Sequence, residues 1–138
     1  MYHQDFILRQ IERLAKAIQQ MLSYHRSGRV DEAYDLLDNC YQESSGFLRA
    51  QLQDWEPEAF LDRLEEDGLA AQELEALSQL TEAEGQMLEA EEDYELARHR
   101  YQITLMLLNK AAEQDITNFS LERQSRLSQL RKRLDNLA

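Results

Sequence analysis

Residues that end helices are scarce in this sequence: its 138 residues include only four glycines and one proline. Between these breaks the chain is dominated by Leu, Ala, Glu, Gln and Arg, which all favour helix. Apolar side chains recur at steps of three and four, and no useful length alternates with a period of two. The sequence therefore predicts an all-α fold of five to six antiparallel helices with short connections and no strand.

The breaks divide the chain into predicted elements within a single domain over residues 1–138. A first helical hairpin is expected over about residues 4–53, with a weak point at Ser44-Ser45-Gly46. The segment Trp55-Glu56-Pro57 is typical of a junction, because proline suits the first position of a helix. The remaining elements are a short connecting helix over about 57–64, a second hairpin over about 70–115 and a last helix over about 118–137.

Charge is distributed unevenly along the chain, whose net charge is -12. Residues 31–95 carry 21 acidic and two basic side chains, whereas both ends carry an excess of Lys and Arg. We expect the basic ends to pack beside the acidic middle, and the densest basic run, Arg131-Lys132-Arg133, to serve such complementarity within the chain or between subunits. Nucleic-acid binding is disfavoured, because the basic residues are not interleaved with aromatic ones and the net charge is negative.

The same sequence indicates a cytoplasmic protein. The single cysteine, Cys40, can form no internal disulfide, and no basic stretch leads into an apolar core at the N-terminus. The longest strongly apolar stretch, residues 103–108, is far shorter than the roughly 20 residues that cross a bilayer. No membrane span is therefore expected.

The stretch GRVDEA, residues 28–33, resembles the turn inside a tetratricopeptide (TPR) repeat, a pair of antiparallel helices. Gly28 takes the place of the turn glycine, and Ala33 that of the small residue that lets the two helices approach. Tyr24 stands where the family commonly has an aromatic residue, and Cys40 falls at the second small position. The resemblance implies that Ala33 and Cys40 face the core.

A second stretch, residues 85–101, resembles the same hairpin. Gly85 takes the small position of the first helix, Glu92 replaces the turn glycine, Ala97 is the small residue after the turn, and Tyr101 is the aromatic residue of the second helix. The two alanines lie 64 residues apart, which is not a multiple of the 34-residue TPR period. The resemblance thus implies TPR-like hairpins and not a regular solenoid.

The opening helix, with its run Phe6-Ile7-Leu8-Arg9-Gln10-Ile11-Glu12-Arg13-Leu14, also resembles that of a small bacterial family of unknown function. That likeness implies no activity. Some TPR repeats clamp the C-terminal carboxylate of a partner with basic residues and asparagine. The corresponding positions here supply no such clamp: Ile18, Leu22, Glu82 and Gln86.

Residues that could carry chemistry are few and scattered. His3 lies near the terminus, His25 ends the first helix, and His99 is expected to face solvent between two arginines. Cys40 is expected to be buried and structural, as most free cysteines are. No catalytic, metal or cofactor site is therefore predicted.

Three functions remain open on the sequence alone. The first is a non-enzymatic protein–protein interaction or scaffold module, and the second is a self-assembling structural dimer. The apolar excess of residues 103–108 and the leucine stripe of the last helix favour a homodimer. The third, a ligand-binding or enzymatic bundle, would require convergent polar groups near the tyrosines: Tyr24, Tyr34, Tyr41, Tyr94 and Tyr101.

Overall fold

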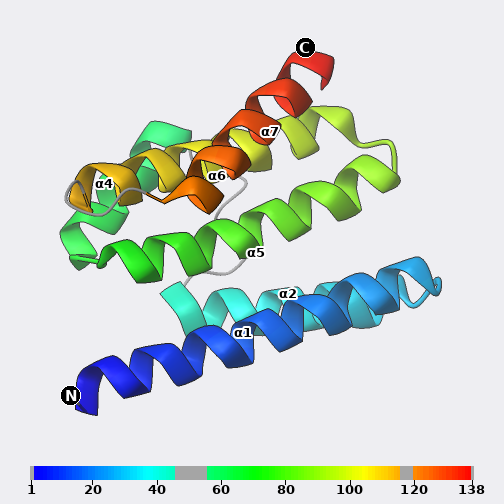
Figure 1. Ribbon diagram of the computed structural model, residues 1–138. Helices are drawn as coiled ribbons and strands as arrows, with labels where there is room; N and C mark the ends of the chain where they lie inside the picture. The colour runs from blue at the N-terminus through cyan, green and yellow to red at the C-terminus, as the bar shows by residue number, and fades with distance from the viewer. Residues whose placement is uncertain (1, 46–55, 116–119, 138) are drawn as a thin grey trace. The chain divides into compact units, whose positions relative to one another are not determined.

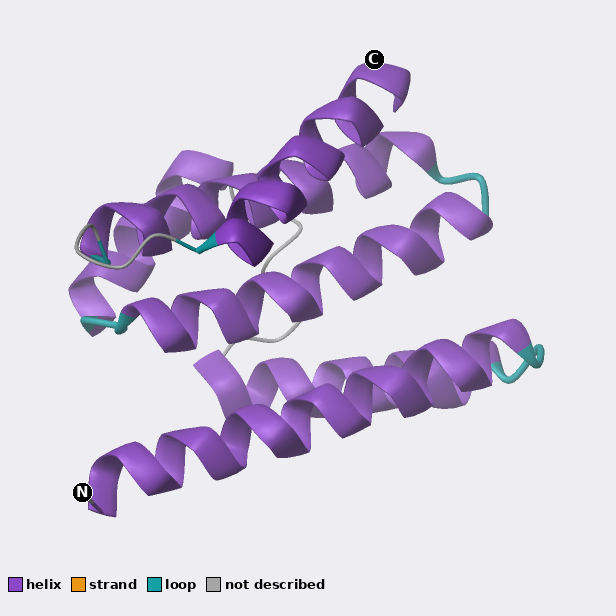
Figure 2. Ribbon diagram, in the orientation of Figure 1, coloured by secondary structure: helices purple, strands orange, loops and turns teal. Residues whose placement is uncertain are grey.

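The computed structural model describes residues 2–45, 56–115 and 120–137. These residues form six α-helices and contain no strand, which confirms the predicted all-α class (Figures 1 and 2). The chain divides into two compact units, Met1–Asp54 and Trp55–Ala138, and the boundary falls at the predicted junction. The predicted helix beyond residue 45, Trp55 of the junction and the expected start near residue 118 lie outside the described residues.

The first unit contains a hairpin of two helices, α1 (Tyr2–Arg26) and α2 (Val30–Ser45). Their inner stripes follow the predicted spacing, with the most buried side chains contributed by both helices: Leu14, Met21, Ala33, Leu37, Cys40 and Tyr41. Helix α2 is described as far as Ser45, and the rest of the predicted weak point lies outside the described residues. Ala33 and Cys40 are thus buried, as the resemblance to a helical hairpin implied.

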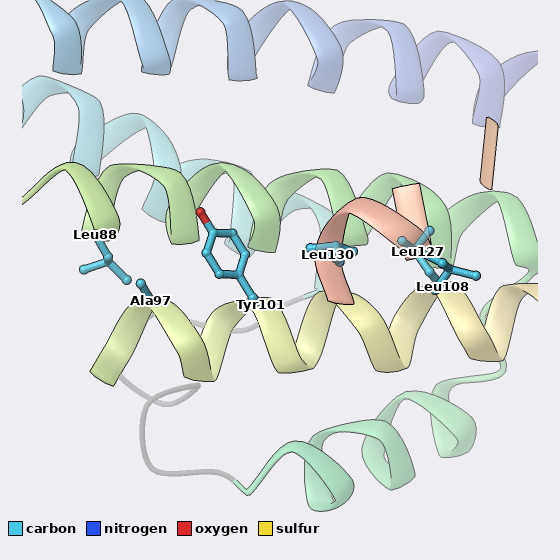
Figure 3. Packing of buried hydrophobic residues seen from close by; sticks show 6 residues of the cluster. All are labelled: Leu88, Ala97, Tyr101, Leu108, Leu127 and Leu130. Atoms are coloured by element: carbon cyan, nitrogen blue, oxygen red, sulfur yellow. The ribbon is translucent and has the colours of Figure 1, made fainter. Parts of the chain in front are cut away.

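The second unit contains α4 (Pro57–Asp67), α5 (Ala71–Ala90), α6 (Tyr94–Gln114) and α7 (Leu121–Leu137). Helix α6 contacts α4, α5 and α7, so it is the central helix of this unit (Figure 1). Leucines from three helices meet in its core, together with Ala97 and Tyr101 (Figure 3). Pro57 occupies the first position of α4, and Gly68 ends that helix with a left-handed backbone.

The apolar excess at residues 103–108 is used inside the chain. Ile103, Leu107 and Leu108 are completely buried, and Leu105 packs against the core formed with α7. The predicted leucine stripe of α7 faces the same core, with Leu127 and Leu130 buried. These side chains therefore need no second subunit to cover them, and the homodimer stays a prediction without that support.

The turns of the two hairpins have the same backbone geometry. Gly28 has φ +83° and Glu92 has φ +65°, both in the left-handed region. In each turn the next N–H reaches back five residues: Arg29 donates to the Tyr24 carbonyl and Asp93 to the Leu88 carbonyl, both at 2.9 Å. Many helices end in this way, with a left-handed residue followed by an N–H group that donates back to the last helical turn. Glu92 thus occupies the glycine position of the turn, as predicted.

Replacing Glu92 by glycine should stabilise the protein. A left-handed backbone costs a residue with a side chain about 1–2 kcal/mol, and glycine adopts it freely. Glycine also makes the unfolded chain more flexible, so we expect a net gain of about 0.5–1 kcal/mol in the free energy of unfolding. Urea denaturation followed by far-UV circular dichroism measures this gain.

The matched control is Glu91→Gly, because the neighbouring Glu91 has φ -85° and is also exposed. Glu91→Gly should lower the free energy of unfolding, because the backbone at position 91 carries no left-handed strain that glycine could relieve. Gly28→Ala should lower the free energy of unfolding by about 1 kcal/mol, because it introduces the strain that Glu92 already carries. Equal effects of glycine at positions 91 and 92 would contradict the strained-turn explanation.

Candidate functional site

Acidic side chains on α5 face basic side chains on α7. Glu75, Glu82 and Glu89 recur every seven residues, which keeps them on one side of α5. Arg123 pairs with Glu75 and with Asp115, and Arg126 pairs with Glu82 at 2.7 Å. The acidic middle of the chain and its basic C-terminal region are therefore complementary within one unit, as the charge distribution predicted.

The residues that provide this complementarity were not the ones expected. The prediction relied on the run Arg131-Lys132-Arg133, but Arg123 and Arg126 make the ion pairs. Arg131 and Lys132 are exposed, and within the described residues neither forms an ion pair. The run lies on the turn of α7 beyond the paired arginines, and its last member, Arg133, is half-buried against Tyr101.

At Glu89, the third of these acidic residues, the phenol of Tyr101 lies between the carboxylate and Arg133. The Tyr101 hydroxyl donates a hydrogen bond to Glu89 Oε1 at 2.9 Å and accepts one from Arg133 Nη1 at 3.2 Å. The guanidinium carbon of Arg133 lies 5.5 Å from the centre of the Tyr101 ring. Burial, and then the hydrogen bond to Glu89, raise the pKa of Tyr101 above its ordinary value, so the phenol stays neutral.

Two surface depressions meet at Glu89 and Arg133. One, of about 250 Å³, is also lined by Gln86, Ala90 and Tyr101. The other, of about 320 Å³, is completed by side chains of α7: Gln129, Lys132, Asn136 and Leu137. We call the residues around both depressions the α5–α7 face. Figure 3 shows the Tyr101 side chain extending from α6 towards α5, with its hydroxyl at the α5 end of the ring.

The α5–α7 face can form hydrogen bonds and ion pairs with a bound group. Its lining combines amide, guanidinium, ammonium, phenol and carboxylate groups, and contains no serine, cysteine or histidine. Gln86, considered earlier as a clamp position, lines this face, whereas Glu82 is engaged by Arg126. Ile18 and Leu22 are half-buried residues of α1 in the other unit. The face is thus suited to recognition.

The tyrosines considered as pocket residues are distributed over both units. In the first unit, Tyr24 accepts a hydrogen bond from Gln20, Tyr34 packs edge-on against His25 and Tyr41 is buried. In the second unit Tyr94 is half exposed, and Tyr101 lines the α5–α7 face.

Histidines do not gather with other metal-ligating groups. His25 is engaged with Tyr34, and the side chain of His3 lies outside the described residues. His99 was expected to face solvent, but it is half-buried, and its ring contacts the buried Arg100. Among the described side chains, no group of three or more His, Cys, Asp or Glu is placed to hold a metal ion.

Cys40 borders a small cavity of about 70 Å³ between α1 and α2, lined also by Arg13 and Glu43. Its side chain is 5% exposed, which agrees with the predicted structural role. Burial, and to a lesser degree the charge of Glu43, raise the pKa of the Cys40 thiol to about 11. The thiol therefore stays protonated at neutral pH, and it is a poor nucleophile.

We expect Cys40 to react slowly with iodoacetamide at pH 8 in the folded protein and rapidly after unfolding in urea. Because the thiol pKa rises on folding from about 9 to about 11, Cys40 stabilises the fold fully at low pH. This contribution is lost as the pH rises from about 9 through 11. Mass spectrometry of labelled protein measures the rate, and Cys40→Ala is the control. Equal labelling rates in the folded and unfolded chain would contradict this account.

A buried polar layer between α5 and α6 was not foreseen. Glu84 and Arg100 form an ion pair at 2.6 Å, and both side chains are completely buried. Next to this pair, the hydroxyls of Thr81 and Thr104 lie 2.7 Å apart. The spacing along α6 could have indicated this burial, because Arg100 and Thr104 lie three and seven residues after the buried Ala97 and therefore on the same side of the helix.

Comparisons with family models, curated proteins and solved structures found no match to this chain. No helix among the described residues combines the length and the apolar character that crossing a bilayer requires. The α5–α7 face and its chemistry are thus the observations that bear on function.

Proposed function

We propose that the protein is a non-enzymatic protein–protein interaction or scaffold module that binds a partner segment on the α5–α7 face. The observation that carries the proposal is the pair of depressions that meet at Glu89 and Arg133. Arginine lines both depressions and tyrosine lines the smaller one, and these two residue types dominate binding energy at many interfaces. Helices on several sides supply the lining, so the surface is formed before a partner arrives.

Preorganisation of the central residues supports this proposal. The Tyr101 ring is buried, and its hydroxyl is held between Glu89 and Arg133. Arg133 and Glu89 are therefore positioned by a rigid group and lose little side-chain freedom when a partner binds. The lining amides, Gln86, Gln129 and Asn136, can donate and accept hydrogen bonds with a peptide backbone.

The resemblance of both hairpins to TPR units also supports an interaction role, as an analogy of fold. The left-handed residue in each turn and the complete burial of Ala33 and Ala97 are compatible with this analogy. In TPR-like arrangements, helices present rigid surfaces to partner segments.

Site-specific photocrosslinking tests the proposal. Benzoylphenylalanine placed at the exposed Gln129, on the α5–α7 face, should crosslink a defined partner in an extract of the native cell. The control position is Asp62, which is exposed on α4. An adduct obtained at position 129 and not at position 62, identified by mass spectrometry, is the expected result.

Two outcomes would count against the proposal. Identical adducts from both positions would indicate non-specific capture. An adduct between two copies of this chain would instead favour the self-assembling dimer.

A further inference from the structure

We infer that the α5–α7 face binds an acidic segment of another protein, whose carboxylates pair with Lys132 and Arg133. This inference rests on the proposed function, since it names the chemistry of the partner at the same face. It follows from the way in which the ion pairs between α5 and α7 end.

Of the three acidic residues spaced along α5, the first two form ion pairs with α7 and the third does not. Glu75 and Glu82 each receive an arginine of α7 directly. Glu89, at the equivalent position one heptad later, accepts its hydrogen bond from the neutral Tyr101 hydroxyl. Arg133 donates to that same hydroxyl, and no ion pair of Arg133 is found within the described residues.

Cations therefore accumulate at the C-terminal end of the face. Arg131, Lys132 and Arg133 are consecutive, and across the described residues none of them pairs with a carboxylate. Lys132 and Arg133 line the same depression, in which Glu89 is the single acidic residue. Although Glu89 and Glu82 attract Arg133 electrostatically, the lining of this depression has two cations and one carboxylate, on a chain whose net charge is -12.

Recognition of a carboxylate suits this geometry. The Arg133 guanidinium has further N–H donors besides the Nη1 group that contacts Tyr101, and its planar fork matches a carboxylate. Lys132 adds a second charge next to it, and Gln129 and Asn136 supply neutral donors on the same helix. A segment with neighbouring Asp or Glu side chains would be complementary to this set.

Charge also separates this partner from other occupants. A second copy of this chain would bring another net charge of -12, which opposes association. A short acidic segment carries less charge, and at physiological salt repulsion beyond roughly 8 Å is screened. A nucleic acid would place phosphates along a longer path than the single turn of α7 that carries these cations.

Fluorescence anisotropy with the full chain tests the inference. The probe is a short labelled peptide that alternates glutamate and serine, and its control has glutamine in place of glutamate. We expect binding of the glutamate peptide only. Lys132→Glu should weaken it by roughly tenfold, since it reverses a charge at the face.

Lys16→Glu is the matched control. It makes the same charge change at an exposed residue of α1, so the net charge of the two variants is identical. We expect it to change affinity by less than about twofold. Equal weakening by both variants would show a general effect of net charge and would overturn the inference. Tighter binding of a single-stranded DNA oligonucleotide would overturn it too.

Failure of this inference can be distinguished from failure of the proposed function. If position 129 crosslinks a partner but the glutamate peptide does not bind, the partner is not acidic and the interaction role stands. If the peptide binds in a manner that depends on Lys132 but no partner is crosslinked, the face recognises carboxylates and the proposed role fails.

Discussion

Replacing Arg100 by methionine should lower the free energy of unfolding of the second unit by about 3–5 kcal/mol. Methionine keeps much of the volume of the aliphatic part of arginine, so packing changes little. The substitution removes the guanidinium that donates to Glu84 at 2.6 Å in a fully buried position. The carboxylate then stays in the core without this partner, which is strongly unfavourable. Urea denaturation followed by circular dichroism measures the loss.

Two controls separate the buried charge from other effects of the substitution. Arg98→Met changes a half-buried arginine of the same helix, and we expect a loss below about 0.5 kcal/mol. The double variant Glu84→Leu with Arg100→Met removes both charges, and we expect its stability to equal or exceed that of the wild type. A double variant as unstable as Arg100→Met alone would show that shape, and not charge, dominates at this position.

Replacing Gly85 by alanine should destabilise the protein by about 1–2 kcal/mol, although alanine favours helix by about 1 kcal/mol. A Cβ atom at this position would lie 2.6 Å from Cε1 and 2.8 Å from Cδ1 of Tyr101. The ring cannot move away easily, because it is buried and its hydroxyl is held by Glu89 and Arg133. Thermal unfolding measured by calorimetry records this loss.

The same substitution should have the opposite sign once the ring is removed. In a Tyr101→Leu background the ring is absent, so the Cβ atom of alanine at position 85 has no ring to clash with. The helix preference of alanine should then stabilise the protein by up to about 1 kcal/mol. A constant loss in both backgrounds would contradict an effect that acts through the Tyr101 ring. The difference between the two backgrounds is the coupling energy of the pair.

Local patterns predicted the helices well. Apolar spacing located the stripe of α1, and Gly28 and Pro57 marked a turn and a helix start where the structure has them. The resemblance of residues 85–101 to a TPR hairpin placed Glu92 in a glycine position, and its backbone is left-handed. These features depend on a few neighbouring residues, which explains why a single sequence was enough to find them.

Features that depend on contacts between distant residues were not predicted. The burial of Glu84 and Arg100 depends on the mutual register of α5 and α6, and an isolated acid or base is usually placed on the surface. Charge balance correctly indicated complementarity but did not show which arginines provide it. The α5–α7 face combines residues of three helices, so no single stretch of the sequence could have located it.

The way in which α7 is attached has a consequence for motion. Its buried residues within the described range are Arg123, Leu127 and Leu130, far fewer than those of α5 or α6. Native-state opening starts in elements with few buried contacts, so α7 can detach while the α5–α6 hairpin persists. Detachment of α7 would separate Lys132 and Arg133 from the residues of the face on α5 and α6. A ligand that contacts α7 and α5 together would therefore oppose detachment and slow amide exchange throughout α7.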